Sequence, residues 1–330
     1  MRALVMTAPG GAENSEIRET QVPRPGPGEV AIDVSHAGLN FVDVMARRGD
    51  PGYVSAWPYV PGIEVAGTVR ALGPGVEGLA VGQRVAAAPA GGGIAEIAIA
   101  PAALTVPLPD GLSAAVAAAA PAGLVTALLL LADAGRFTAG DSVLVHSAGG
   151  GIGAAIAQLV PALGGGRLIG TVGRPEKAAG AERSGYDVAL ARGEGLADAI
   201  LAANHGRGVD LVLDPLGTTA LDVDVEVAAP GGRIVLFGNA SGTAPAPLPP
   251  AGVLLGRNLA IGGFSHRGLS AAAPHRIAAA LRRILGLLAA GDLDLPVTEV
   301  AALAEVPAVH DLLAAGRGEG KYVVRLGAEG

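Results

Sequence analysis

The sequence predicts an α/β protein in which a β-rich region precedes a parallel, doubly wound sheet. Three observations lead to this prediction. The first 110 residues consist of short strand candidates separated by Gly- and Pro-rich turns. Between residues 142 and 263, six compact apolar segments alternate with segments of helix length. The length of 330 residues is enough for two domains with substantial cores.

The β-rich region contains four strand candidates and one short helix. Turn clusters at 23–28 and 73–75 punctuate the strands. The helix is predicted to begin near Asn40 and to run towards Arg48. The strand candidates are Met1–Thr7, Glu29–Ala37, Gly67–Leu72 and Arg84–Ala88.

The alternating region begins with an apolar strand, a glycine-rich turn and a predicted helix over Ile152–Leu163. Six parallel strands covered on both faces are what a doubly wound nucleotide-binding sheet requires. After them, residues 271–313 are rich in Leu and Ala and are predicted to be helical, and a last strand is expected over Lys321–Leu326. The six strands are Ser142–His146, Arg167–Val172, Asp187–Leu190, Val209–Leu213, Arg233–Phe237 and Leu259–Gly263.

Composition restricts the possible functions. The chain has 23 Lys and Arg against 30 Asp and Glu, so its net charge of −7 offers no basic footprint for nucleic acid or anionic lipid. The absence of cysteine excludes disulfides, thiolate metal sites and a cysteine nucleophile, and it is compatible with the reducing cytoplasm that we expect. The uncharged stretch 111–132 is long enough to span a bilayer. Because Pro121 and Gly123 interrupt it, we expect two buried helices with a break between them.

The turn after the first strand of the alternating region has the pattern GxGxxA, formed by Gly149, Gly151 and Ala154. Glycines there permit a tight turn with positive φ and let a pyrophosphate approach the backbone. The helix that follows presents unpaired N–H groups and the positive end of its dipole to that anion. An ordinary strand-to-helix turn is the alternative. The residues expected to bind a dinucleotide are Ser147, Gly149, Gly150, Gly151, Ile152 and Gly153.

The end of the second strand of the alternating region indicates which dinucleotide is bound. NAD sites usually carry an acidic residue at this position for the ribose 2′-hydroxyl. Here Gly173 stands in its place, and Arg174 and Lys177 bring positive charge. We therefore predict NADPH as the cofactor, with a solvated basic turn as the alternative.

Five motifs in order along the chain resemble the zinc-free quinone oxidoreductase branch of the medium-chain dehydrogenase/reductase superfamily. The strand that leads into the AxxGGxG turn adds to this resemblance, which extends nearly from end to end. The motifs are GLNFVD at Gly38–Asp43, PGIEVAG at Pro61–Gly67, GLVTA at Gly123–Ala127, GGRIVLFGNASG at Gly231–Gly242 and GKYVV at Gly320–Val324.

The resemblance implies two domains with the active site in the cleft between them. A GroES-like catalytic domain would comprise residues 1–122 and 265–330, and a Rossmann NADPH-binding domain would comprise residues 123–264. Relatives are commonly dimers through the edge strand near Gly262–His266, so a homodimer is expected. The zinc alcohol dehydrogenase branch would have a Cys ligand at Asn40 and a His ligand at Ile63, and this chain has neither. We therefore expect no metal.

The resemblance also assigns residues to the site. Asn40 and Asp43 are catalytic candidates from the resemblance: Asn40 would either donate to a substrate oxygen or cap the short helix, and Asp43 would orient its neighbours. Tyr53 and Tyr59 are added because they flank Trp57 just before the PGIEVAG motif. They would either donate a proton, line the pocket or serve in core or lid packing. Further cofactor contacts are expected from Thr126, Arg192, Phe237, Gly238, Asn239, Ser241 and Lys321.

Two departures from the family pattern concern the substrate. Met45 replaces a frequent tyrosine, and the segment 264–270, expected to be a loop with an exposed His266, is not typical of the branch. The sequence thus predicts an NADPH-dependent, zinc-independent reductase that transfers hydride to a quinone or a similar activated acceptor. Two alternatives remain: an enoyl reductase acting on an α,β-unsaturated ketone or thioester, and an NADPH-binding protein with little catalytic activity.

Overall fold

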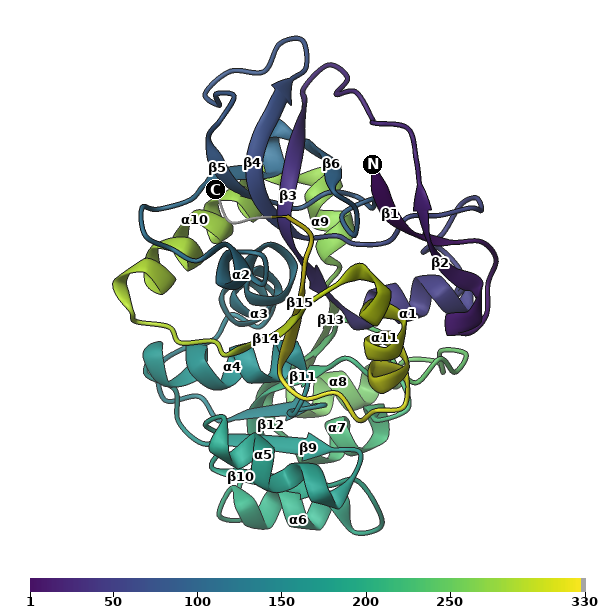
Figure 1. Cartoon of the computed structure of the whole chain (residues 1–330). Helices are drawn as coiled ribbons and strands as arrows, with labels where there is room; N and C mark the ends of the chain where they lie inside the picture. Colours follow the sequence, from purple (N-terminus) through teal and green to yellow (C-terminus); the bar gives the residue numbers. More distant parts are fainter. Residues whose placement is uncertain (328–330) are drawn as a thin grey trace. The chain divides into compact units, whose positions relative to one another are not determined.

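The computed structural model describes residues 1–327, which form two compact units (Figure 1). Within the described residues, unit 1 comprises 1–125 and 266–327, and unit 2 comprises Thr126–Ser265. The sequence places these boundaries after residues 122 and 264.

Unit 1 is built around the long strand β3, Glu29–Leu39, in a seven-stranded sheet. The strands follow the order β14-β15-β3-β4-β5-β7, and β6 also pairs with β3. A separate two-stranded sheet joins β1 to β2. The other strands are β1 (Arg2–Met6), β2 (Ser15–Glu19), β4 (Val65–Leu72), β5 (Arg84–Ala87), β6 (Ile97–Pro101), β7 (Thr105–Pro107), β14 (Val297–Val300) and β15 (Lys321–Arg325).

Helices and short helical turns complete unit 1. Helix α1 directly follows β3, so the GLNFVD motif spans the end of this strand and the start of this helix. The helices are α1 (Phe41–Arg48), α2 (Ala114–Ala117), α9 (His266–Ala272), α10 (Pro274–Ala290) and α11 (Val306–Ala314). The short turns are η1 (Ala12–Asn14), η2 (Ala102–Leu104), η3 (Ala120–Leu124) and η6 (Leu303–Glu305).

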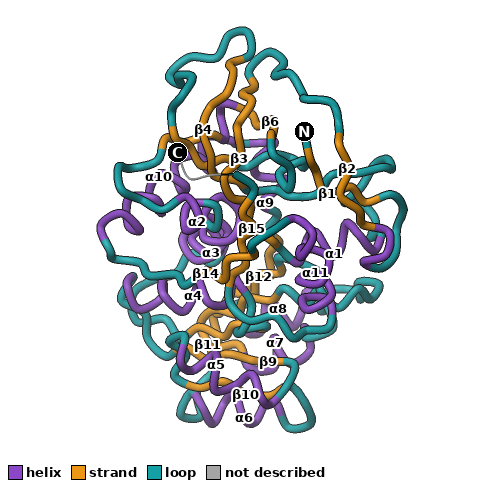
Figure 2. Tube along the Cα trace, viewed as in Figure 1, coloured by secondary structure: helices purple, strands orange, loops and turns teal. Residues whose placement is uncertain are grey.

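Unit 2 contains a six-stranded sheet whose neighbouring strands are all parallel, in the order β10-β9-β8-β11-β12-β13. Figure 2 colours its strands orange and the helices purple. The strands are β8 (Val143–His146), β9 (Leu168–Val172), β10 (Val188–Ala191), β11 (Val209–Asp214), β12 (Ala228–Leu236) and β13 (Ala260–Gly263). The helical segments are α3 (Val125–Leu129), η4 (Leu130–Ala134), α4 (Gly151–Ala162), η5 (Pro175–Lys177), α5 (Ala178–Arg183), α6 (Leu196–Ala203), α7 (Leu221–Val227) and α8 (Ala251–Arg257).

This strand order confirms the predicted fold class. The chain leaves the first strand, β8, towards β9 and β10 and then returns to β11 on the other side of β8. The reversal creates a switch point at the carboxyl ends of β8 and β11, which is where open α/β sheets bind ligands.

Two predictions about the C-terminal part of unit 1 were wrong. The stretch 271–313 is not helical throughout, because β14 interrupts it and pairs in parallel with β15. β14 has the sequence VTEV, whose three β-branched residues favour a strand despite the Leu- and Ala-rich surroundings. The segment 264–270 is not a loop, since α9 begins at His266.

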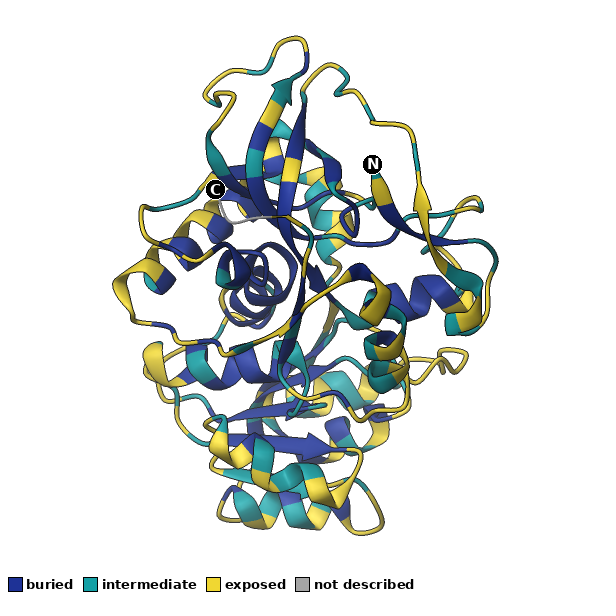
Figure 3. Ribbon diagram, in the orientation of Figure 1, coloured by how far each residue is buried: buried dark blue, intermediate teal, exposed yellow. Residues whose placement is uncertain are grey.

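The long uncharged stretch forms a helix that is mostly buried. One helix among residues 1–327, Ala114–Ala134, is long and apolar enough to span a membrane, and 94% of its most apolar window is buried within the protein (Figure 3). The expected break at Pro121 was wrong. The helix continues there through a wider π turn, Ala120–Leu124, which accommodates a proline that has no N–H to donate.

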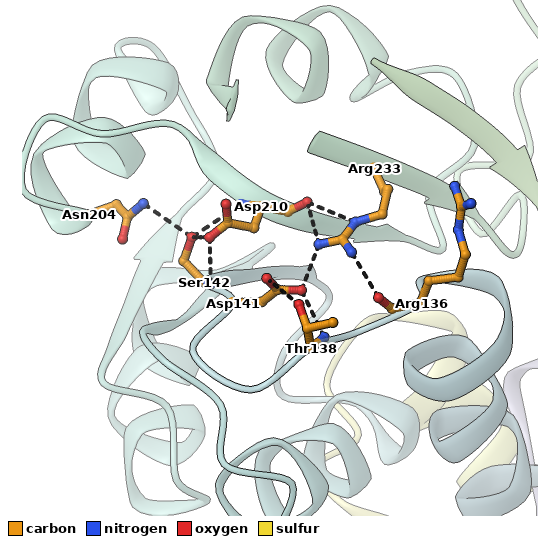
Figure 4. A network of polar contacts seen from close by, with 7 residues as sticks. All are labelled: Arg136, Thr138, Asp141, Ser142, Asn204, Asp210 and Arg233. Atoms are coloured by element: carbon orange, nitrogen blue, oxygen red, sulfur yellow. Dashed lines mark hydrogen bonds and ion pairs between the residues drawn. The ribbon is translucent and has the colours of Figure 1, made fainter. Parts of the chain in front are cut away.

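A network of polar contacts ties the amino ends of β8 and β11 to Arg233 within β12 (Figure 4). The Asp210 carboxylate accepts from the Ser142 backbone N–H at 2.8 Å and from its hydroxyl at 2.7 Å. Arg233 Nη2 donates to Asp141 Oδ2 at 2.6 Å, and Nη1 donates to the Arg136 carbonyl at 2.8 Å. These bonds hold the starts of β8 and β11 against β12, and therefore help to set the register of the three strands.

Replacing Arg233 with Met tests this network. The substitution leaves the partly buried Asp141 carboxylate without its ion pair, so the free energy of unfolding should fall by about 2–4 kcal/mol in urea titrations. The exposed Arg183 is the matched control, and Arg183→Met should change the value by less than about 0.5 kcal/mol. Equal effects of the two substitutions would contradict a structural role for the network.

Candidate functional site

The glycine-rich turn of unit 2 joins β8 to α4 at the switch point of the sheet. The expectation of positive φ at Gly149 and Gly151 was wrong, since neither is among the positive-φ residues of the chain. Ser147 makes the left-handed turn instead, with a φ of 59°. Gly150 is the N-cap of α4 and gives it no side-chain hydrogen bond. The first N–H groups of α4 are therefore left without a side-chain cap, as an anion site at a helix N-terminus requires.

The remaining glycines of this turn differ in what they permit. A Cβ atom on Gly153 would lie 2.3 Å from the Ala148 carbonyl oxygen, so only glycine lets α4 pack against the turn. A Cβ on Gly149 would meet only the Lys177 side chain, at 4.0 Å. The outer side of the turn is thus open to a ligand beside an ammonium group. This geometry fits a dinucleotide pyrophosphate.

A second basic group lies at the neighbouring strand ends. β9 and β10 run in parallel with Val172 opposite Ala191, which brings Gly173 and Arg192 side by side. A Cβ on Gly173 would lie 2.6 Å from Arg192 Nη2, so the guanidinium extends over the glycine. Arg192 Nη1 is buried and has no hydrogen-bond partner within residues 1–327. Burial lowers the pKa of this guanidinium, against the opposing effect of the Asp214 carboxylate. A buried donor without an acceptor indicates a place for an anion.

The predicted cofactor residues Phe237, Gly238, Asn239 and Ser241 follow β12 at this edge of the sheet. Thr126 is buried in α3. The Phe237 N–H donates to the Asp214 carbonyl at 2.9 Å. The side chains of Asn239 and Ser241 bond to each other at 3.0 Å, and Asn239 also donates to the Thr243 carbonyl. These two side chains therefore fold their own loop, which follows Gly238.

A buried polar cluster that sequence reasoning missed supports the same edge. His146 Nδ1 lies 2.7 Å from the Thr171 hydroxyl, and Nε2 lies 2.7 Å from Asp224 Oδ1. Burial, together with the neighbouring Asp224, raises the pKa of Asp214. These side chains come from the ends of β8, β9 and β11 and from α7. The hydrogen bonds of His146 connect the ends of β8 and β9 to α7.

Unit 1 contains a polar site centred on the buried Lys321. Its ammonium donates to the Leu39 carbonyl at 3.0 Å, to Asn40 Oδ1 at 2.7 Å and to Glu64 Oε1. An ammonium has three N–H donors, and all three are used here. We expected Lys321 to contact the cofactor. In this structure its ammonium has no donor left for a cofactor phosphate. Glu64 is the residue that sequence reasoning missed, although it lies within the PGIEVAG motif.

Asn40 and Asp43 meet in this site at the start of α1. Asn40 is the N-cap residue, and its backbone N–H donates to Asp43 Oδ2 at 2.8 Å. Asp43 Oδ1 accepts from the Gly62 N–H at 3.1 Å, which ties α1 to the PGIEVAG segment. The Asn40 carboxamide bonds Glu64 and Lys321, so this residue joins the helix start to the buried ion pair.

The two candidate tyrosines lie in the loop that follows α1. Tyr59 pairs through its backbone with Met6, and its ring meets Trp57 edge-on with centroids 6.5 Å apart. Burial raises the pKa of both Tyr53 and Tyr59, so both phenols are protonated at neutral pH. The Arg267 guanidinium of α9 donates to the Gly52 carbonyl of this loop.

His266 also differs from the expectation of an exposed histidine. It is half-buried, and its Nε2 lies 2.9 Å from the Pro121 carbonyl oxygen in the π turn. Burial lowers the pKa of this imidazole below its ordinary value. His266 therefore connects the start of α9 to the long buried helix.

Comparisons with known proteins identify the family. A family profile described as "Alcohol dehydrogenase GroES-like domain" matches residues 26–110, and one described as "Zinc-binding dehydrogenase" matches residues 151–285. A quinone oxidoreductase of Pseudomonas aeruginosa is 34% identical over 332 residues, which cover 98% of this chain and 99% of the relative. The chain belongs to the medium-chain dehydrogenase/reductase superfamily.

This medium-chain reductase lies in the quinone oxidoreductase-like branch and is an oxidoreductase, which confirms the resemblance seen in its motifs. The crystal structure of Escherichia coli quinone oxidoreductase complexed with NADPH matches it with a TM-score of 0.89 at 26% identity, covering 98% of this chain and 100% of that one. A phenolphthiocerol/phthiocerol polyketide synthase polypeptide of Mycobacterium tuberculosis is 34% identical over 336 residues, which cover 99% of this chain and 15% of that polypeptide.

The residues of this medium-chain reductase do not fit the zinc that the second profile's description implies. Within residues 1–327, no group of three or more His, Cys, Asp or Glu side chains is placed to hold a metal ion. The zinc alcohol dehydrogenase branch would have a Cys ligand at position 40. Here the Asn40 carboxamide accepts from the Lys321 ammonium and donates to the Glu64 carboxylate. A lysine ammonium beside this position opposes a divalent cation.

Asp43 gives this medium-chain reductase a testable pH dependence. Burial raises the pKa of its carboxyl from 3.8 to about 6, against the opposing effects of its two backbone hydrogen bonds and of Lys321; Glu64 adds to the rise. As the pH falls from about 6 to about 4, the folded state therefore takes up a proton before the unfolded state does. The free energy of unfolding of the wild type, relative to Asp43→Asn, should rise by about 2–3 kcal/mol between pH 7.5 and pH 4.

The comparison needs urea titrations of both proteins at both pH values. Asp110→Asn, which changes an exposed carboxyl, is the control and should show no such pH dependence. A difference between wild type and Asp43→Asn that stays constant with pH would contradict the raised pKa.

Proposed function

We propose that this protein is an NADPH-dependent, zinc-independent reductase that transfers a hydride to a quinone or a similar activated acceptor. The observation that carries the proposal is the Arg192 guanidinium extending over Gly173, with the buried Nη1 lacking a protein acceptor within residues 1–327. The similarity to quinone oxidoreductases supports the acceptor class, and the NADPH in the E. coli structure supports the cofactor. The cytoplasmic location and the homodimer stay predictions.

The geometry at Gly173 favours a 2′-phosphate over a 2′-hydroxyl. A Cβ at position 173 would lie 2.6 Å from Arg192 Nη2, so a larger residue there would displace the guanidinium from its place over the glycine. Arg174 follows directly, and Lys177 lies beside Gly149. Each charge-assisted hydrogen bond to a phosphate contributes about 1.5–3 kcal/mol, which corresponds to roughly 10- to 100-fold in affinity.

The chemistry requires little from the protein beyond positioning. When bound, NADPH supplies the hydride, and a quinone takes up that hydride and one proton to become a hydroquinone. Quinones and activated alkenes accept hydride without strong electrophilic help. We propose that the Asn40 carboxamide donates a hydrogen bond to the acceptor's oxygen, as an oxyanion donor does.

An enoyl reductase acting on an α,β-unsaturated ketone or thioester is the second candidate. The observation that favours it is the 34% sequence identity with a segment of the polyketide synthase polypeptide. A 2-enone turnover far faster than 1,4-benzoquinone turnover would favour this candidate. Tight NADPH binding without oxidation by either acceptor would favour a binding protein with little activity.

Arg192→Ala tests the cofactor assignment directly. The substitution removes a charge-assisted contact, so the Kd for NADPH should rise about 10- to 100-fold while the Kd for NADH changes less than about twofold. Binding of both nucleotides can be followed by the change in their fluorescence, and NADPH oxidation by 1,4-benzoquinone at 340 nm.

Two controls define the result. Arg183→Ala, which changes an exposed arginine of the same unit, should leave both Kd values unchanged. Arg174→Ala should weaken NADPH binding in the same direction as Arg192→Ala. An unchanged ratio of NADPH to NADH affinity in Arg192→Ala would overturn the proposed 2′-phosphate site.

A further inference from the structure

The Glu64 carboxylate in unit 1 is buried and accepts from four donors. Oε1 accepts from Asn40 Nδ2 at 2.8 Å and from the Lys321 ammonium. Oε2 accepts from the backbone N–H groups of Ala122 at 2.8 Å and Gly123 at 3.2 Å. Each oxygen therefore has two partners, which leaves the carboxylate no capacity to bind or protonate a ligand.

Lys321 is committed in the same way. Its side chain is 3% exposed, and its three donors are used by Leu39, Asn40 and Glu64. Neither charge of the pair is thus available to a substrate. Among the described residues, the Asn40 carboxamide is the one other side chain that both charges bond, so Asn40 is the group through which the pair would act on a ligand.

The two charges fix the Asn40 carboxamide in one orientation. Oδ1 accepts from the ammonium, and one of the two Nδ2–H groups donates to the carboxylate. Flipping the amide would turn the NH2 group towards the ammonium and the oxygen towards the carboxylate, which both charges oppose. The second Nδ2–H is not used by Glu64, and its direction is set by the other two bonds.

The backbone around the pair leaves room only for this arrangement. A Cβ on Gly38 would lie 2.2 Å from Glu64 Oε1, so glycine is required for the carboxylate to reach Asn40. Asn40 N and Gly62 N both donate to Asp43, which holds the start of α1 against the segment that carries Glu64. The Asn40 carboxamide is therefore held from its backbone and from both of its polar atoms.

We propose that Glu64 and Lys321 are positioning residues, whose buried ion pair aims the remaining Asn40 Nδ2–H at the oxygen of the hydride acceptor. This inference rests on the proposed function, in which Asn40 is the donor to that oxygen. The pair makes no contact with the acceptor itself. Its effect is to hold one hydrogen-bond donor in the direction that the reaction needs, which removes the cost of ordering the donor during turnover.

The decisive variant removes both charges together. Lys321→Met alone leaves the buried Glu64 uncompensated and can prevent folding. The double variant Glu64→Gln/Lys321→Met avoids an unpaired charge while it releases the Asn40 carboxamide. A matched control is Asp33→Asn/Arg70→Met, which removes an exposed ion pair of the same unit with a separation of 2.8 Å.

Steady-state kinetics with NADPH and 1,4-benzoquinone form the first measurement. We expect kcat/KM for benzoquinone to fall about 100-fold in the double variant, with the Kd for NADPH unchanged within about twofold. Asn40→Ala should cause a similar loss. Adding Asn40→Ala to the double variant should cause no further loss, because the pair acts only through this residue.

Other kinetic outcomes overturn the inference. Losses that multiply when Asn40→Ala is combined with the double variant would show that the pair acts independently of Asn40. A double variant with wild-type kcat/KM would show that orientation by the pair is not needed. An Asn40→Ala variant with full activity would overturn the role of Asn40 as donor, and the positioning role with it.

A second measurement does not depend on turnover. The two side-chain Nδ2–H signals of Asn40 in a ¹H–¹⁵N spectrum, assigned by their loss in Asn40→Ala, should be widely separated in the wild type and in the control. They should move towards the values of a solvated asparagine in the double variant. If this shift is seen while the wild type reduces neither benzoquinone nor an enone, the proposed function fails and the orientation by the pair stands. Unchanged Asn40 signals in the double variant would overturn the positioning role itself.

Discussion

A buried ion pair between Glu64 and Lys321 is the constraint on which the candidate site of unit 1 depends. Taking two charges out of water costs several kcal/mol per ion, and their attraction offsets this cost only where every remaining donor and acceptor is satisfied. Here four donors meet the carboxylate and three acceptors meet the ammonium. Segments that are far apart in the sequence are therefore held in one geometry around Asn40.

Unit 2 shows the opposite case, since one buried guanidinium nitrogen within residues 1–327 is left without a hydrogen-bond acceptor. The parallel pairing of β9 with β10 brings Arg192 over Gly173, and no protein acceptor within residues 1–327 meets the buried Nη1. In unit 1 every hydrogen-bonding group of the ion pair has a protein partner, so the pair holds the site together. In unit 2 the Arg192 guanidinium has a donor left for a ligand. This contrast separates positioning residues from binding residues among groups of similar chemistry.

The fold was predictable because its signals are local. Six apolar strands alternating with helices indicated the doubly wound sheet, and the glycine-rich turn marked its switch point. The strands β2, β6, β7 and β14 were missed because their local signals are weak. β2 is mostly exposed and carries three charged residues, β6 contains two alanines and a proline, β7 has only three residues, and β14 follows a Leu- and Ala-rich stretch.

The details of the site were less predictable, because they depend on contacts between distant residues. Lys321 and Glu64 are 257 positions apart, so no local pattern indicated that the lysine would be used within the protein. The left-handed conformation of Ser147 was not predicted, because the glycines that follow it can adopt that conformation at a lower cost. A crystal structure of the protein with NADPH would test the account most directly. The account predicts the 2′-phosphate against Arg192 and Lys321 still bonded to Leu39, Asn40 and Glu64. A structure in which Lys321 leaves Glu64 to bind a cofactor phosphate, with Arg192 unpartnered, would contradict it.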